Sequence, residues 1–184
     1  MNLRNFHWPV VLTTLVLTLS VTLGAMYLVR LRTESAPLQR FYAAQPEVRQ
    51  ADIRRDGDQY TINLTLNSVA DFRQTYLKLD QGTLAVLKDH KYYQLVIHDG
   101  RNQALEDDYY QLHFGLQSGI ATGDFNRMAN DFNSKAQALG LDNYKVWVDT
   151  DRLFVQIQGH GGYLYQVLPR TAPVTANATG GAAA

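Results

Sequence analysis

The feature that most constrains this chain is an uncharged apolar run near its start. From Val10 to Val29 no residue is charged, and leucine, valine and hydroxyl residues dominate. About 20 helical residues at ~1.5 Å each span about 30 Å, which matches the hydrocarbon core of a bilayer. The run therefore predicts a single transmembrane helix over residues 10–29. The residues expected to anchor it are Trp8, Val10, Leu17, Leu23, Val29 and Arg30.

A cleaved signal peptide is the competing interpretation of the same run. Such a peptide has an apolar core of about 7–15 residues that ends at a small-x-small cleavage site. This core is longer, and its one tolerable site, Thr22-Leu23-Gly24, lies inside the apolar run. An uncleaved anchor in the cell membrane is therefore favoured. We expect the rest of the chain outside the cytoplasm, although the flanking cations Arg30 and Arg32 alone favour the opposite orientation.

Hydroxyl side chains recur every four residues within the run, at Thr14, Thr18 and Thr22. A stripe of small residues at this spacing lets two membrane helices approach closely. The alternative is that each hydroxyl bonds the carbonyl four residues earlier and faces lipid. Both interpretations are open from the sequence.

The rest of the chain divides into four parts around the apolar run. They are a short flank at 1–9, a juxtamembrane connector at 30–50, a globular α+β domain at 51–170 and a disordered tail at 171–184. The connector contains two prolines, between which Leu38, Phe41 and Tyr42 share one face if that stretch is helical. The tail is uncharged and rich in glycine and alanine, so it lacks the apolar bulk that offsets ordering entropy.

Hydrophobic periodicity predicts the element order ββαβααβββ for the globular domain. Helical spacing and strand-like alternation both occur, and Asp124 stands where a helix cap is expected. The predicted helices cover 69–87, 105–120 and 125–139, and the predicted strands 51–55, 60–66, 92–98, 144–148, 153–157 and 163–167. Because hairpins dominate, we expect an α+β fold in which helices cover one face of a mostly antiparallel sheet, as a two-layer α/β sandwich.

Composition excludes several classes of function. Lys plus Arg and Asp plus Glu both total 17, and this balance argues against a nucleic-acid partner. The absence of cysteine excludes disulfides, cysteine zinc sites and thiol catalysis.

Motifs for catalysis, metals or cofactors are weak. The five histidines show no metal-ligand spacing; they are His7, His90, His98, His113 and His160. The acidic run Glu106-Asp107-Asp108 is explained by the dipole of the helix that it begins. We therefore predict no enzyme activity, no catalytic residue, no metal and no cofactor.

Tyrosine is the residue type whose abundance gives a positive signal, with 11 residues in the chain. Tyrosine is enriched at protein interfaces because it joins apolar area to a hydrogen-bonding tip, although it also packs ordinary sheets. The candidate contact residues are Tyr163, Tyr165, Tyr92 and Trp147.

A short anchor before a small α+β domain is an architecture common among bacterial envelope proteins. We therefore expect a single-pass accessory or assembly protein that contacts the lipid bilayer and either a protein partner or a second copy of itself. The alternative is a membrane-tethered sensor or small-ligand-binding module, which needs an apolar pocket ringed by His98, His113 or tyrosine.

Overall fold

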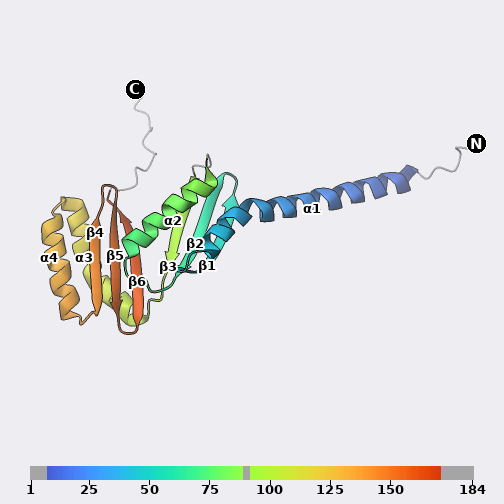
Figure 1. Cartoon of the computed structure of the whole chain (residues 1–184). Helices are drawn as coiled ribbons and strands as arrows, with labels where there is room; N and C mark the ends of the chain where they lie inside the picture. Colours follow the sequence, from blue (N-terminus) through green and yellow to red (C-terminus); the bar gives the residue numbers. More distant parts are fainter. Residues whose placement is uncertain (1–7, 89–91, 171–184) are drawn as a thin grey trace, which may run out of the picture.

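The computed structural model describes residues 8–88 and 92–170, and within its first helix it describes the side chains of residues 12–24 and 36–43. It confirms the α+β class and the predicted order of elements after the first helix (Figure 1). The elements are α1 (Trp8–Ala43), β1 (Val48–Asp56), β2 (Gln59–Leu66), α2 (Phe72–Leu87), β3 (Tyr92–His98), α3 (Gln103–Thr122), α4 (Phe125–Ala138), β4 (Asn143–Val148), β5 (Arg152–Gly159) and β6 (Gly162–Pro169). The tail at 171–184 lies outside the described residues.

The strands form two sheets, so the prediction of a single sheet is wrong. One sheet has the order β1-β2-β3 and the other β4-β5-β6. Pairing is antiparallel except between β2 and β3, which are parallel because α2 carries the chain back between them. A single bridge between Gly100 and Tyr163 joins the end of the first sheet to the start of β6.

The second sheet is covered on both faces, whereas the prediction placed helices on one face. Five consecutive residues of β5, from Leu153 to Ile157, are buried. Phe154 faces a core under α2, while Leu153, Val155 and Ile157 face a core under α3 and α4. The second sheet therefore separates two cores (Figure 1).

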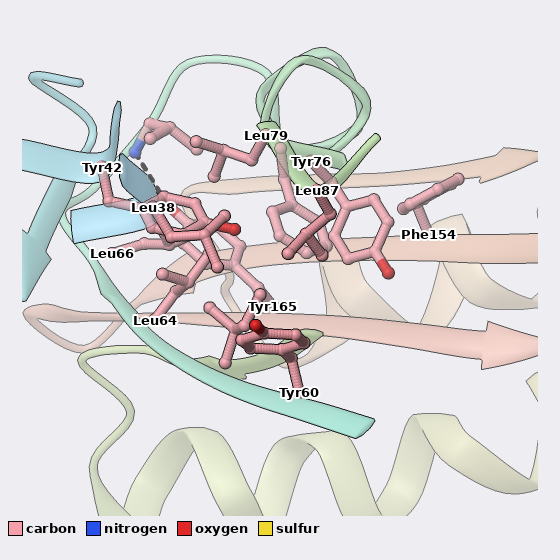
Figure 2. Packing of buried hydrophobic residues seen from close by; sticks show 13 residues of the cluster. Leu38, Tyr42, Tyr60, Leu64, Leu66, Tyr76, Leu79, Leu87, Phe154 and Tyr165 are labelled. Atoms are coloured by element: carbon pink, nitrogen blue, oxygen red, sulfur yellow. Dashed lines mark hydrogen bonds between the residues drawn. The ribbon is translucent and has the colours of Figure 1, made fainter. Parts of the chain in front are cut away.

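The core under α2 contains side chains from both sheets, from α2 and from the last turns of α1 (Figure 2). The Phe72 ring stacks on the Tyr165 ring with centroids 4.6 Å apart and meets the Phe154 ring edge-on at 6.1 Å. Leu38 and Tyr42, from the last turns of α1, are also fully buried there. The folded body therefore begins inside the segment 30–50 that was predicted as a connector.

The N-terminus of α2 is held by side chains of the second sheet. Gln156 is fully buried; its Oε1 accepts a hydrogen bond from the Phe72 N–H at 2.9 Å, and its Nε2 donates to the Val69 carbonyl at 3.2 Å. The Tyr165 hydroxyl accepts a hydrogen bond from the Val69 N–H at 2.8 Å. Asp71 caps the helix through the Gln74 N–H. At α4, Asp124 accepts from the Arg127 N–H, which confirms the predicted cap.

We predict that Gln156→Leu lowers the free energy of unfolding by about 1–3 kcal/mol, because the buried Phe72 N–H loses its partner, while the Val69 carbonyl keeps its bond from Gln158 and the side-chain volume changes little. Urea denaturation of the full chain in detergent, followed by near-UV circular dichroism, measures this change. The matched control is Gln111→Leu at an exposed position, which should stay within about 0.5 kcal/mol of the parent. Equal stability of the two variants would contradict the role given to Gln156.

Candidate interaction surface

Helix α1 leaves the body as a projecting rod (Figure 1). Every residue from 12 to 24 is exposed, including Leu17 at 66% and Leu23 at 58%. Among the described residues, no helix is both long enough and apolar enough to cross a membrane. The side chains of Trp8, Val10, Val29 and Arg30, which the sequence assigned to the anchor, lie outside the described residues.

The hydroxyls of α1 bond their own helix. Thr18 donates to the Thr14 carbonyl at 2.7 Å, and Thr22 donates to the Thr18 carbonyl at the same distance. Ser20 donates to the Val16 carbonyl at 2.8 Å. These are the local bonds that the second interpretation expects, and the close approach of two such helices stays a prediction.

The last turns of α1 are joined tightly to α2. Leu38 and Tyr42 are buried and Phe41 is partly buried beside them, so the three share one packed face as their spacing predicted. The Tyr42 hydroxyl forms a hydrogen bond with the Thr83 hydroxyl. The Phe41 ring lies against Gly82, where an added Cβ would be 2.0 Å from the nearest ring atom. The exposed part of α1 is thus continuous with a helix end that is built into the core.

We predict that Gly82→Ala lowers the free energy of unfolding by about 1–3 kcal/mol, because the new methyl group displaces the Phe41 ring. The control is Gly115→Ala in α3, where an added Cβ meets nothing within 4 Å and helix propensity alone should raise stability by up to about 1 kcal/mol. Chemical denaturation of both variants checks the opposite signs. A stabilising effect of Gly82→Ala would contradict the close approach of α1 and α2.

The four aromatic residues predicted as a contact surface do not gather on one exposed face. Tyr165 is buried against Phe72, because its strand is covered by α2. Tyr163 is partly buried and donates its hydroxyl to the Leu66 carbonyl at 2.9 Å. Trp147 is partly buried beside the same core, and Tyr92 alone of the four is largely exposed, at 69%. Tyr165 is therefore corrected from a contact residue to a core residue.

Burial changes the acidity of several of these tyrosines. It raises the pKa of Tyr42 to about 12, and it raises the pKa of Tyr76 and of Tyr165 above the ordinary value of 10. The physical cause is the same in each case, since a buried phenolate loses its hydration.

This shift predicts a loss of stability at alkaline pH. Above about pH 10 the unfolded chain releases tyrosine protons that the folded chain retains, so the free energy of unfolding falls as pH rises, by up to about 1.4 kcal/mol per pH unit for each such tyrosine. For Tyr42 the fall ends near pH 12, where the folded state also ionises. Urea unfolding between about pH 8 and about pH 12 measures the slope. Tyr42→Phe should make it shallower, and an unchanged slope would contradict the assignment.

An exposed aromatic cluster lies instead on the outer side of α3. Tyr110 is 65% exposed and Phe114 is 57% exposed, and their ring centroids are 5.3 Å apart. His113 lies between them, with its ring centroid 4.3 Å from that of Phe114. We call these three residues the α3 aromatic cluster. The sequence indicated it only weakly: Tyr110 and Phe114 are four residues apart, but they lie off the apolar stripe that marks the buried face.

A groove runs between α3 and α4 next to this cluster. Its volume is about 370 Å³, and its walls include Phe114, Gly115, Gly119 and Met128, with Arg127 at its edge. A larger surface groove of about 560 Å³ lies between residues 46–47, residues 67–71 and α2, and it is lined mainly by polar residues. Neither groove is lined by His98 or His113, the residues named for the ligand-binding alternative.

His160 and Asp108 form a pair that the sequence did not indicate. The His160 Nε2 lies 3.0 Å from Oδ2 of Asp108, which is buried on α3. His160 occupies the turn between β5 and β6 with φ of 53°, and its carbonyl accepts a hydrogen bond from Asn102 at 2.8 Å. The pair fixes this turn on the N-terminus of α3. Among the described residues, no three His, Asp or Glu side chains form a group that could hold a metal ion.

Comparison of the chain with known protein families, curated proteins and solved structures found no match. The features of the molecule that point to a function are the exposed part of α1 and the α3 aromatic cluster.

Proposed function

We propose that this chain is a single-pass membrane protein of a bacterial envelope whose α+β body acts through protein–protein contacts. The observation that carries the proposal is the exposure of every residue from 12 to 24, a helical stretch without charge that presents large apolar side chains such as Leu15, Leu17 and Leu23. A contiguous apolar surface of this kind is costly in water and marks a membrane or protein contact. The uncharged sequence from Val10 to Val29 has the length that a bilayer requires.

The attachment of α1 to the body supports a permanent anchor. Leu38 and Tyr42 fix the last turns of α1 in the core, so anchor and body are joined through one continuous helix. A flexible tether would leave the orientation of the body free, whereas a helical joint restricts it. We propose that the body lies outside the cytoplasm and that its role is not catalytic.

The α3 aromatic cluster is the proposed contact of the body, in place of the tyrosines on β6. Helix α3, which carries the cluster, lies at the end of the molecule opposite to the projecting part of α1 (Figure 1). A bilayer that holds α1 therefore leaves α3 accessible to a partner outside the lipid. Exposed tyrosine and phenylalanine side chains are the types that protein interfaces use as anchors. The balanced charge of the chain favours protein over nucleic acid as the partner.

We predict that the double variant Leu17→Arg with Leu19→Arg shifts the protein from the membrane fraction to the aqueous fraction, because each arginine at the centre of a membrane helix costs about 2.5–3.5 kcal/mol. Carbonate extraction followed by intact-mass measurement checks both the location and the absence of cleavage, since the full chain has a mass of 20.8 kDa.

The matched control carries two arginines on the body, at Leu84 and Tyr92, which are also exposed apolar side chains. This variant should stay in the membrane fraction. Recovery of the parent protein in the aqueous fraction, shortened at its N-terminus, would overturn the proposal.

A further inference from the structure

The α3 aromatic cluster projects from the surface beside the groove between α3 and α4. We call the part of this groove at Gly115 and Ser118 the notch. Tyr110, His113 and Phe114 project from α3 and contact one another. Phe114 also forms part of the groove wall, which continues along Gly115 and Ser118. On α3 the two features lie within about two turns of each other, and α4 forms the opposite wall of the groove.

Gly115 is not explained by packing within the chain. A Cβ at this position would meet nothing within 4 Å, whereas a Cβ at Gly119 would be 2.5 Å from the Met128 sulfur. Gly119 is therefore required by the contact between α3 and α4. Glycine inside a helix is less favourable than alanine, and at Gly115 no neighbour in the described part of the chain requires it. Its effect is to keep the notch open beside Phe114.

We propose that this surface binds a second copy of the chain, with the Phe114 ring of each copy seated in the notch at Gly115 and Ser118 of the other. A surface that carries both a projection and the matching notch is self-complementary about a two-fold axis, as isologous dimers require. The assignment deepens the proposed interaction role and rests on it, because it names the partner.

The charged residues at the edge of the groove are compatible with a second copy of the chain as the partner. Arg127 and Asp131 are both exposed on α4, and Asp124 lies at the start of the same helix. Arg127 is 3.8 Å from Asp131, a long contact that leaves the cation available to a carboxylate of another copy. The groove edge thus carries both signs of charge, and in the proposed dimer Arg127 of each copy meets Asp124 or Asp131 of the other. Anchoring through α1 raises the effective concentration of copies on the membrane.

Disulfide cross-linking of the full chain in detergent micelles tests the dimer, and the absence of native cysteine makes single introduced cysteines unambiguous. Ser118→Cys lies in the groove, close to the proposed axis, and should cross-link in most molecules under mild oxidation. The matched control is Ser134→Cys, which is exposed on α4 outside the groove and should cross-link at least tenfold less. Equal cross-linking at both positions would overturn the proposal, because contact through α1 alone brings copies together without selecting this surface.

A second variant blocks the notch without disturbing the fold. Gly115→Leu places a strong helix former in open space, so the unfolding midpoint should stay unchanged or rise, while cross-linking of Ser118→Cys should fall at least tenfold. Phe114→Ala should reduce cross-linking to a similar extent. Unchanged cross-linking in Gly115→Leu, or a monomeric parent protein by light scattering, would overturn the dimer. A parent protein that is anchored in membranes yet monomeric would overturn this inference and leave the anchor proposal standing.

Discussion

The structure depends on the hydrogen bonds by which the second sheet fixes the start of α2. Gln156 and Tyr165 reach across from β5 and β6 to the backbone of Val69 and Phe72. These contacts join segments more than 80 residues apart, and they give the Phe72 N–H at the start of α2 a partner that the Asp71 cap does not supply. The last turns of α1 pack against α2. The hydrogen bonds that fix α2 therefore also determine how the projecting helix is attached to the rest of the body.

Most of the local structure could be predicted from the sequence, because periodicity and turn residues act over short distances. The hairpin at Gly57, the strand at 92–98 and the cap at Asp124 all follow from neighbouring residues. The number of sheets could not be predicted in this way. The burial of every residue from Leu153 to Ile157 requires helices on both faces of β5, and only the tertiary structure specifies which helices these are.

The candidate site was harder to predict than the fold, for a related reason. Tyr165 and Tyr110 are the same residue type, and the alternating pattern of β6 does not show which of its faces a distant helix covers. The pair between Asp108 and His160 likewise joins residues 52 positions apart, so the acidic run was attributed to the helix dipole alone. Exposure of the α3 aromatic cluster and the open space at Gly115 are properties of the assembled body.

The burial of β5 on both faces has a consequence for how the body unfolds. Its alternate side chains belong to different cores, and the two cores have no residue in common. Separation of this strand from its neighbours exposes both cores to water at once, so any opening that displaces β5 destabilises both halves together. Through this strand, the stability of the core that holds the end of α1 is coupled to the stability of the core under α3 and α4.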